Sequence, residues 1–277
     1  MKLPRSKAII LAIFFLAACG GAAALSRAWW PSVSPVLAPS PDNTGGAGSQ
    51  VRHPVLVELF TSEGCSSCPP ADALLARLDA EQFVPGAQAI VLSEHVTYWN
   101  HEGWQDPYSL DEATFRQQAY AERFGPDTVY TPEAVIDGEA QVVGSDEAAV
   151  RRTIAQAAAA TPAELEIEGV QWQGNAVHFK VHLTKGSPDP AGARLSAALA
   201  SDSAQSSVKT GENAGRTLRH VAVVRTMQEL NKGALDGRDL ALKLPGNSGP
   251  GPVRLVVFLT DKHSGHILGA TEQTLTR

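Results

Sequence analysis

The sequence is poor in cysteine and has no excess of positive charge. Its 277 residues include three cysteines, and 23 Lys and Arg stand against 29 Asp and Glu, for a formal net charge of −6. Proteins that bind nucleic acid usually carry a basic patch with interleaved aromatics. No such stretch occurs, so no nucleic-acid partner is expected. A closed structural zinc site usually needs a second Cys or His pair, and no second cysteine pair exists.

Several catalytic signatures are also missing. The chain has no Gly-rich phosphate loop, no Ser-His-Asp signature and no internal repeat. Its composition, with 43% hydrophobic and 19% charged residues, is that of an ordinary globular protein. The length suggests about two domains.

The N-terminus predicts export. Basic residues in the first seven positions precede an uncharged run at residues 8–25, which is typical of a secretory signal. Residues 16–19, Leu-Ala-Ala-Cys, resemble a bacterial lipobox, which would make Cys19 a lipidation site and the protein a lipoprotein. Cleavage as an ordinary signal peptide and retention as a membrane anchor remain as alternatives. Each places the protein in the periplasm or at the cell surface, secreted or held at the membrane by a lipid or an N-terminal anchor.

The rest of the chain divides into three parts by composition. Residues 26–50 are rich in Pro, Ser, Gly and Ala and predict a flexible tether. Residues 51–161 alternate strand-like and helix-like patterns in the order βαβαββα. Residues 162–277 contain short apolar runs separated by glycine turns, which predict a mainly antiparallel, sandwich-like β domain.

The expected elements of the first domain have local causes. Strands are expected at 55–60, 89–92, 134–136 and 141–143. Helices are expected at 69–80, from a Ser109–Glu112 capping box to about 124, and from Ser145 or Asp146 through 160. Asp137-Gly138 is a hairpin signal. In the second domain, strands are expected at 165–170, 177–183, 195–199, 218–224, 240–244, 253–259 and 267–271.

The main chemical motif is Cys65-Ser66-Ser67-Cys68, between a buried strand and a helix. Two cysteines at this spacing can close a small disulfide ring. Backbone N–H groups at the helix start can stabilise the thiolate of the first cysteine. Lipidation of Cys19 would leave these two as an even pair. The motif predicts a redox-active disulfide with no other cofactor.

Residues 55–144 resemble the thioredoxin superfamily in the apolar strand, the cysteine pair and Thr131-Pro132. The phrase at 58–72 and Gly-Glu-Asn-Ala-Gly-Arg-Thr-Leu at 211–218 are similar to a family of secreted bacterial proteins known only as a domain of unknown function. The resemblance implies an α/β thioredoxin-like first domain. It supplies no substrate.

The resemblance also implies roles for single residues. Cys65 would be the attacking thiol, which requires access, and Cys68 the resolving thiol. Pro132 would be a cis-proline, with the backbone of Thr131 presented to a bound peptide. Glu58 would be the buried acid beneath the cysteines.

Two features depart from the thioredoxin pattern. The loop between Glu58 and Cys65 is one residue longer, which leaves open whether Glu58 reaches the sulfurs. Pro69-Pro70 favours a helix start near Cys68, which places Cys65 ahead of the helix and predicts a less acidic thiol there.

The loop from His95 to residue 106 is a second candidate site. Trp99 and Trp104 are candidate substrate-binding anchors beside Cys65. His95 or His101 could instead join Cys65 and Cys68 in a copper site, because soft sulfur ligands favour Cu(I). A packed polar loop without either function is the third interpretation.

These observations favour an extracytoplasmic thiol–disulfide oxidoreductase acting on the thiols or disulfides of other proteins. The alternatives are a non-catalytic thioredoxin-like binding lipoprotein with a permanent Cys65–Cys68 disulfide, and a copper-handling module.

Overall fold

The computed structural model describes residues 51–125, 129–184, 192–230, 235 and 237–276. The expected signal segment, tether and lipidation site at Cys19 lie outside these residues. Within the described ranges, no helix has the length and apolar character needed to cross a membrane.

The elements follow the expected order along the chain. The helices are α1 (Pro69–Glu81), the short 3-10 helix η1 (Tyr98–His101), α2 (Asp111–Phe124) and α3 (Glu147–Ala157). The strands are β1 (His53–Thr61), β2 (Ala87–His95), β3 (Glu133–Ile136), β4 (Ala140–Val143), β5 (Leu165–Gln173), β6 (Ala176–Leu183), β7 (Ala193–Ser207), β8 (Thr217–Glu229), β9 (Leu240–Lys243), β10 (Val253–Asp261) and β11 (Ile267–Leu275).

The helix starts show which local signals act. Helix α1 begins at Pro69 with Cys68 at its N-cap, as the proline pair predicts, because the first turn has no use for the missing N–H groups. The Asp146 side chain caps α3 by accepting from the Ala149 N–H. The capping box predicted at Ser109 is wrong: Leu110 is the N-cap of α2, without a side-chain bond. The Ser109 hydroxyl instead donates to the Asp106 carbonyl.

Eight strands form one mixed sheet in the order β11-β10-β7-β8-β2-β1-β3-β4. β2 is parallel to β1, β3 is antiparallel to β1, and β4 is antiparallel to β3. The sheet continues across the predicted boundary at residue 162, because β8 lies beside β2 and pairs with it at Ser93 and Val223. The described residues from 51 onward form one compact unit, and the two sequence segments share a sheet.

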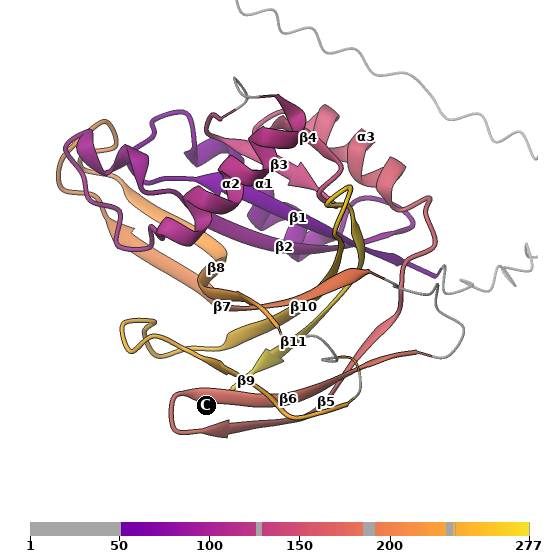
Figure 1. The fold of residues 1–277 in the computed structure, drawn as a ribbon. Helices are drawn as coiled ribbons and strands as arrows, with labels where there is room; N and C mark the ends of the chain where they lie inside the picture. Colours follow the sequence, from indigo (N-terminus) through magenta and orange to yellow (C-terminus); the bar gives the residue numbers. More distant parts are fainter. Residues whose placement is uncertain (1–50, 126–128, 185–191, 231–234, 236, 277) are drawn as a thin grey trace, which may run out of the picture. The chain divides into compact units, whose positions relative to one another are not determined.

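β5, β6 and β9 form a separate antiparallel sheet. Figure 1 shows this sheet at the bottom of the view, with β7, β10 and β11 between it and the helices. Alternate residues of β10 divide between two cores. Val256 and Phe258 belong to the core that includes residues of α1 and α3, while Leu255 and Val257 belong to the core that includes residues of the smaller sheet. The fold is therefore mostly β, with few helices.

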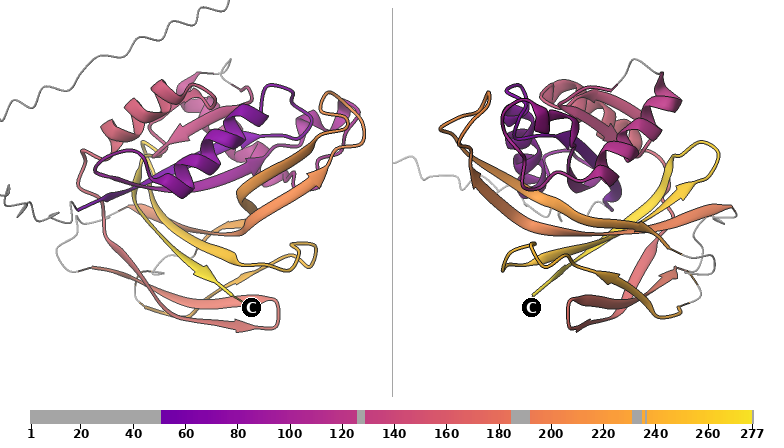
Figure 2. Two further views of the ribbon diagram at one scale, coloured as in Figure 1. Left: turned by 180° about the vertical axis from the view of Figure 1, so that it is seen from behind. Right: turned by 60° about the vertical axis from the view of Figure 1, so that its left-hand side comes forward.

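Three parts of the chain converge at one end of the large sheet. β1 and β2 end together, with Thr61 opposite His95, and α1 starts just beyond. The connection between β7 and β8 reaches the same place. Both views in Figure 2 show this orange hairpin ending beside the indigo segment that follows β1.

Candidate redox site

Cys65 and Cys68 are joined in a disulfide at the start of α1. Both side chains are 0% exposed, although Ser66 and Ser67 between them are exposed. The accessible Cys65 that exchange requires is therefore not present in this state. The backbone between the cysteines faces solvent and the sulfurs lie behind it.

Thr131, which precedes Pro132, lies against the disulfide. The Thr131–Pro132 peptide bond is cis, as the resemblance implies. The Thr131 carbonyl oxygen is 3.9 Å from Cys65 Sγ and accepts a 3.5 Å hydrogen bond from the Ser67 hydroxyl. The structure thus brings together four of the predicted site residues.

Glu58 belongs to a different buried cluster. Its carboxylate accepts from Arg116 and Tyr120 of α2. Burial opposes its ionisation, but the charge and hydrogen bonds of Arg116 lower the pKa of Glu58. The Glu58 side chain points toward α2. Thr61 follows Glu58 by three positions on β1, and its side chain contacts Asp72 of α1. Alternate strand residues face opposite sides, so Glu58 is not placed beneath the cysteines.

Trp99 and Trp104 both use their indole N–H groups inside the site. The Trp99 Nε1 donates to the Thr131 hydroxyl at 2.7 Å. The Trp104 Nε1 donates to the Glu63 carboxylate at 2.9 Å. These half-buried rings brace the loops around the disulfide. An open groove of about 920 Å³ lies between η1 and the start of α2, and its lining includes His101 and Asn100.

The two histidines of the copper hypothesis differ in burial. His95 is buried and its Nδ1 contacts Asp106 at 2.7 Å. Burial opposes ionisation of Asp106, but His95 and two backbone N–H groups lower the pKa of that carboxyl. His101 is exposed on η1. Among the described residues, no three His, Cys, Asp or Glu side chains are grouped to hold a metal ion. The copper site stays a prediction.

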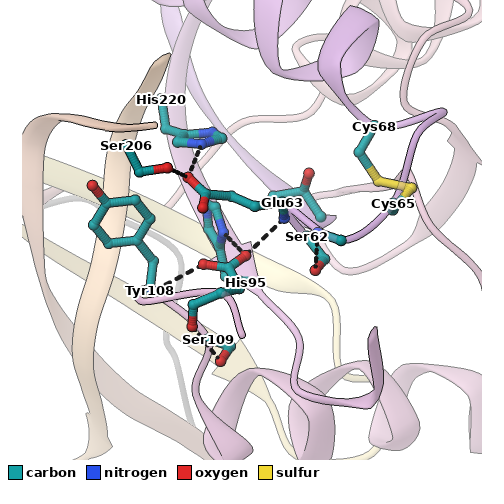
Figure 3. Close-up of polar contacts among 12 residues, drawn as sticks. Ser62, Glu63, Cys65, Cys68, His95, Tyr108, Ser109, Ser206 and His220 are labelled. Atoms are coloured by element: carbon teal, nitrogen blue, oxygen red, sulfur yellow. Dashed lines mark hydrogen bonds and ion pairs between the residues drawn. A yellow bond between two sulfur atoms is a disulfide. The ribbon is translucent and has the colours of Figure 1, made fainter. Parts of the chain in front are cut away.

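A buried cluster that sequence reasoning missed lies beside the disulfide. It consists of Glu63, Asp72 and His220, here called the acid–imidazole cluster. The His220 Nε2 donates to Glu63 Oε1 at 3.1 Å, and its Nδ1 is 3.7 Å from Asp72 Oδ2. The second separation is an ion-pair distance and too long for a direct hydrogen bond. Figure 3 shows His220 and Ser206 converging on Glu63, which comes shortly before Cys65 in the chain.

Electrostatics favour the charged form of His220. Burial disfavours the imidazolium, but the adjacent carboxylates Asp72 and Glu63 outweigh it and raise the pKa of His220 to about 10. His220 is therefore protonated at neutral pH. Glu63 also accepts from the Ser206 hydroxyl. One imidazolium is held between two buried carboxylates.

The connection between β7 and β8, residues 208–216, lies against the cysteine loop and is here called the cap. The Asn213 Nδ2 donates to the carbonyls of Glu63 and Cys65 at 2.9 and 3.0 Å. The Glu212 carboxylate accepts from the Ser66 N–H at 3.0 Å. Gly211, with φ +78°, lies so close to Trp104 that a Cβ would approach the Trp104 Cβ to 3.2 Å. The cap thus docks on the cysteine loop through its own backbone and side chains.

Residues 56–260 match the family of proteins of unknown function DUF1223. This chain belongs to the DUF1223 family. A search of curated proteins finds no match. A crystal structure from a structural genomics consortium, of a protein from Agrobacterium tumefaciens, is similar, with 24% sequence identity and a TM-score of 0.57. The likeness covers 82% of this chain and 96% of that chain, and at this identity it concerns the fold alone.

The DUF1223 match includes both halves of the site. Its range, 56–260, spans the disulfide, the acid–imidazole cluster and the cap. The stretch at 211–218, singled out in the sequence, is the one signal that could have indicated the cap. No signal in the sequence marked His220, because only the fold brings β8 to α1.

Proposed function

We propose that this protein is an extracytoplasmic thiol–disulfide oxidoreductase that acts on cysteines of other proteins through Cys65 and Cys68. The observation that carries the proposal is the disulfide at the start of α1, with the Thr131 carbonyl 3.9 Å from Cys65 Sγ. A backbone carbonyl this close to the first sulfur supports the binding of an extended peptide there.

The arrangement of the first half supports a thioredoxin-like domain. The strands β2-β1-β3-β4 are adjacent in this order, with β1 and β2 parallel and β3 and β4 antiparallel. Helix α1 follows β1 and carries the cysteines at its start. This arrangement supports the thioredoxin-like fold that the resemblance implies.

The exchange reaction runs through a mixed disulfide. A partner thiolate attacks Cys65 Sγ, the bond between the two cysteines breaks, and Cys68 departs as a thiolate with the electron pair. A second partner thiolate then attacks the partner sulfur of the mixed disulfide, and Cys65 leaves. The partner gains a disulfide and this protein becomes a dithiol; the reverse sequence reduces a partner.

The extracytoplasmic location rests on the N-terminal sequence. The basic residues and uncharged run before residue 25, together with the lipobox-like segment ending at Cys19, support export and attachment to a membrane. A disulfide is compatible with an oxidising compartment.

Burial of the sulfurs favours a second candidate function. With Cys65 and Cys68 at 0% exposure, a permanently oxidised disulfide would make this a non-catalytic binding protein. Catalysis therefore requires a movement that exposes Cys65. The two candidates differ in how readily the disulfide is reduced.

The reduction potential separates them. A fragment beginning at residue 51 is equilibrated with glutathione buffers, and its thiols are alkylated and counted by mass. A potential between about −120 and −270 mV supports exchange, whereas one below about −300 mV identifies a locked structural disulfide and refutes it. In a second assay, with a disulfide-containing peptide, Cys65→Ser is expected to abolish exchange. Full activity in that variant would exclude Cys65 as the nucleophile.

A further inference from the structure

The acid–imidazole cluster joins the two halves of the chain at the disulfide. Glu63 precedes the cysteine loop and Asp72 lies on α1, while His220 comes from β8. All three are buried, with exposures of 0%, 5% and 2%. Buried charges are costly unless they are paired, so a cluster kept in this position calls for a role that a hydrophobic contact could not fill.

Asp72 is the member nearest to Cys68 along α1. Its N–H donates to the Cys68 carbonyl at 3.1 Å, so the two residues are one helical turn apart. Residues at this spacing share a helix face, with their Cβ atoms about 5–6 Å apart. Asp72 Oδ1 accepts from the Thr61 hydroxyl at 2.9 Å, which fixes the carboxylate on the side of the helix that faces the end of β1.

We propose that β8 completes the redox site: His220 is a positioning residue that holds Asp72 as the carboxylate which takes the proton from the Cys68 thiol. The inference rests on the proposed function, because it assigns a step within that exchange. It gives the β-rich half of the chain a chemical part in the reaction.

The step balances without an outside reagent. In the direction that reduces a partner, Cys65 is bonded to a partner sulfur and Cys68 is a thiol. The Cys68 proton passes to Asp72, directly or through one water. The Cys68 thiolate then attacks Cys65 Sγ, the intramolecular disulfide forms, and the partner sulfur leaves with the electron pair of the broken bond.

The surroundings of His220 explain why it orients Asp72. Glu63 accepts from its Nε2, and the rings of His95 and Tyr108 lie edge-on with centroids 4.6 and 5.8 Å away. The Nδ1 edge therefore faces Asp72. The His220 ring thereby fixes the position of the Asp72 carboxylate, whose Oδ2 lies 3.7 Å from its Nδ1.

The test measures only the step in which Cys68 attacks the mixed disulfide and releases the partner, here called resolution. Reduced protein is reacted with a peptide disulfide in a rapid-quench instrument, and decay of the mixed disulfide is followed from pH 6 to 9.5. A thiol with an ordinary pKa of about 8.5 is only about 1% ionised at pH 6.5. Asp72→Asn is therefore expected to slow resolution about 100-fold at pH 6.5 and to approach the wild-type rate above pH 9.

Matched variants separate proton transfer from structure. Asp79→Asn changes the same residue type on the same helix, at an ion pair with Arg254, and is expected to leave the pH profile unchanged. His220→Gln should reproduce the pH-dependent slowing, and Asp72→Glu should restore part of the rate. If Asp72→Asn does not fold, His220→Gln supplies the same comparison.

The outcomes distinguish this inference from the proposed function. Wild-type rates with parallel pH profiles in Asp72→Asn and His220→Gln would overturn the inference and leave exchange intact. Absence of any mixed disulfide in the wild-type protein would overturn the proposed function and the inference with it. Slowing that disappears at high pH supports both.

Discussion

Replacing Asn213 by Ala should expose the disulfide to reductants. The Asn213 amide donates to two buried carbonyls, those of Glu63 and Cys65, at 2.9 and 3.0 Å. These bonds exist only while the cap is docked. Each contributes about 1 kcal/mol net, so their loss favours the open cap by about 2 kcal/mol. This corresponds to about a 30-fold increase in the open population.

The assay is the rate of disulfide reduction by excess dithiothreitol, read by alkylation and mass. When opening is fast relative to chemical attack, the rate follows the open population, and Asn213→Ala should be reduced about 30-fold faster than the wild type. Asn175→Ala is the control, because its amide donates to the Leu244 carbonyl in the smaller sheet. Equal rates for Asn213→Ala and wild type would show that the cap is not what limits access to Cys65.

Two further predictions concern stability. Burial raises the pKa of Asp137 to about 7, opposed by the hydrogen bond from the Leu56 N–H. Its contribution to stability is complete below the unfolded-state pKa of about 4 and is lost as pH rises through about 7, a change of at most about 4 kcal/mol. The free energy of unfolding, measured by urea titration, should differ less between pH 5 and pH 8 in Asp137→Asn than in the wild type. An equal difference in both proteins would refute the raised pKa of Asp137. Arg254 pairs with Asp79 at 2.6 Å and with Asp202 at 2.7 Å, with 11% of its side chain exposed. Arg254→Ala should lower the free energy of unfolding by about 3–5 kcal/mol, and a loss below about 1 kcal/mol in the same titration would contradict this.

Local sequence signals predicted the elements better than their assembly. Pro69-Pro70 placed the start of α1 correctly because proline acts within one helical turn. Asp137-Gly138 predicted the turn between β3 and β4, where both residues have positive φ. The Ser109 prediction failed because the Ser109 hydroxyl donates to the Asp106 carbonyl and does not cap α2. The sequence spacing does not show which of the two partners the hydroxyl binds.

The candidate site was only half predictable for the same reason. Cys65 and Pro132 were found through a motif and a resemblance. Glu63 and Ser206 are 143 positions apart, and no periodicity relates them. Glu58 was assigned a role from resemblance, yet Arg116 and Tyr120 bind its carboxylate on the side of α2. Partners this distant are set by sheet topology.

The placement of β8 beside β2 has a consequence for biosynthesis. β2 is an inner strand only after residues 217–229 have been made, since β8 is its neighbour on one side. A nascent chain that ends near residue 161 exposes the backbone edge of β2, and such an edge invites pairing with other chains. The N-terminal half therefore depends on the last third of the polypeptide for protection from aggregation, and its cysteine pair is made before the surface that buries it.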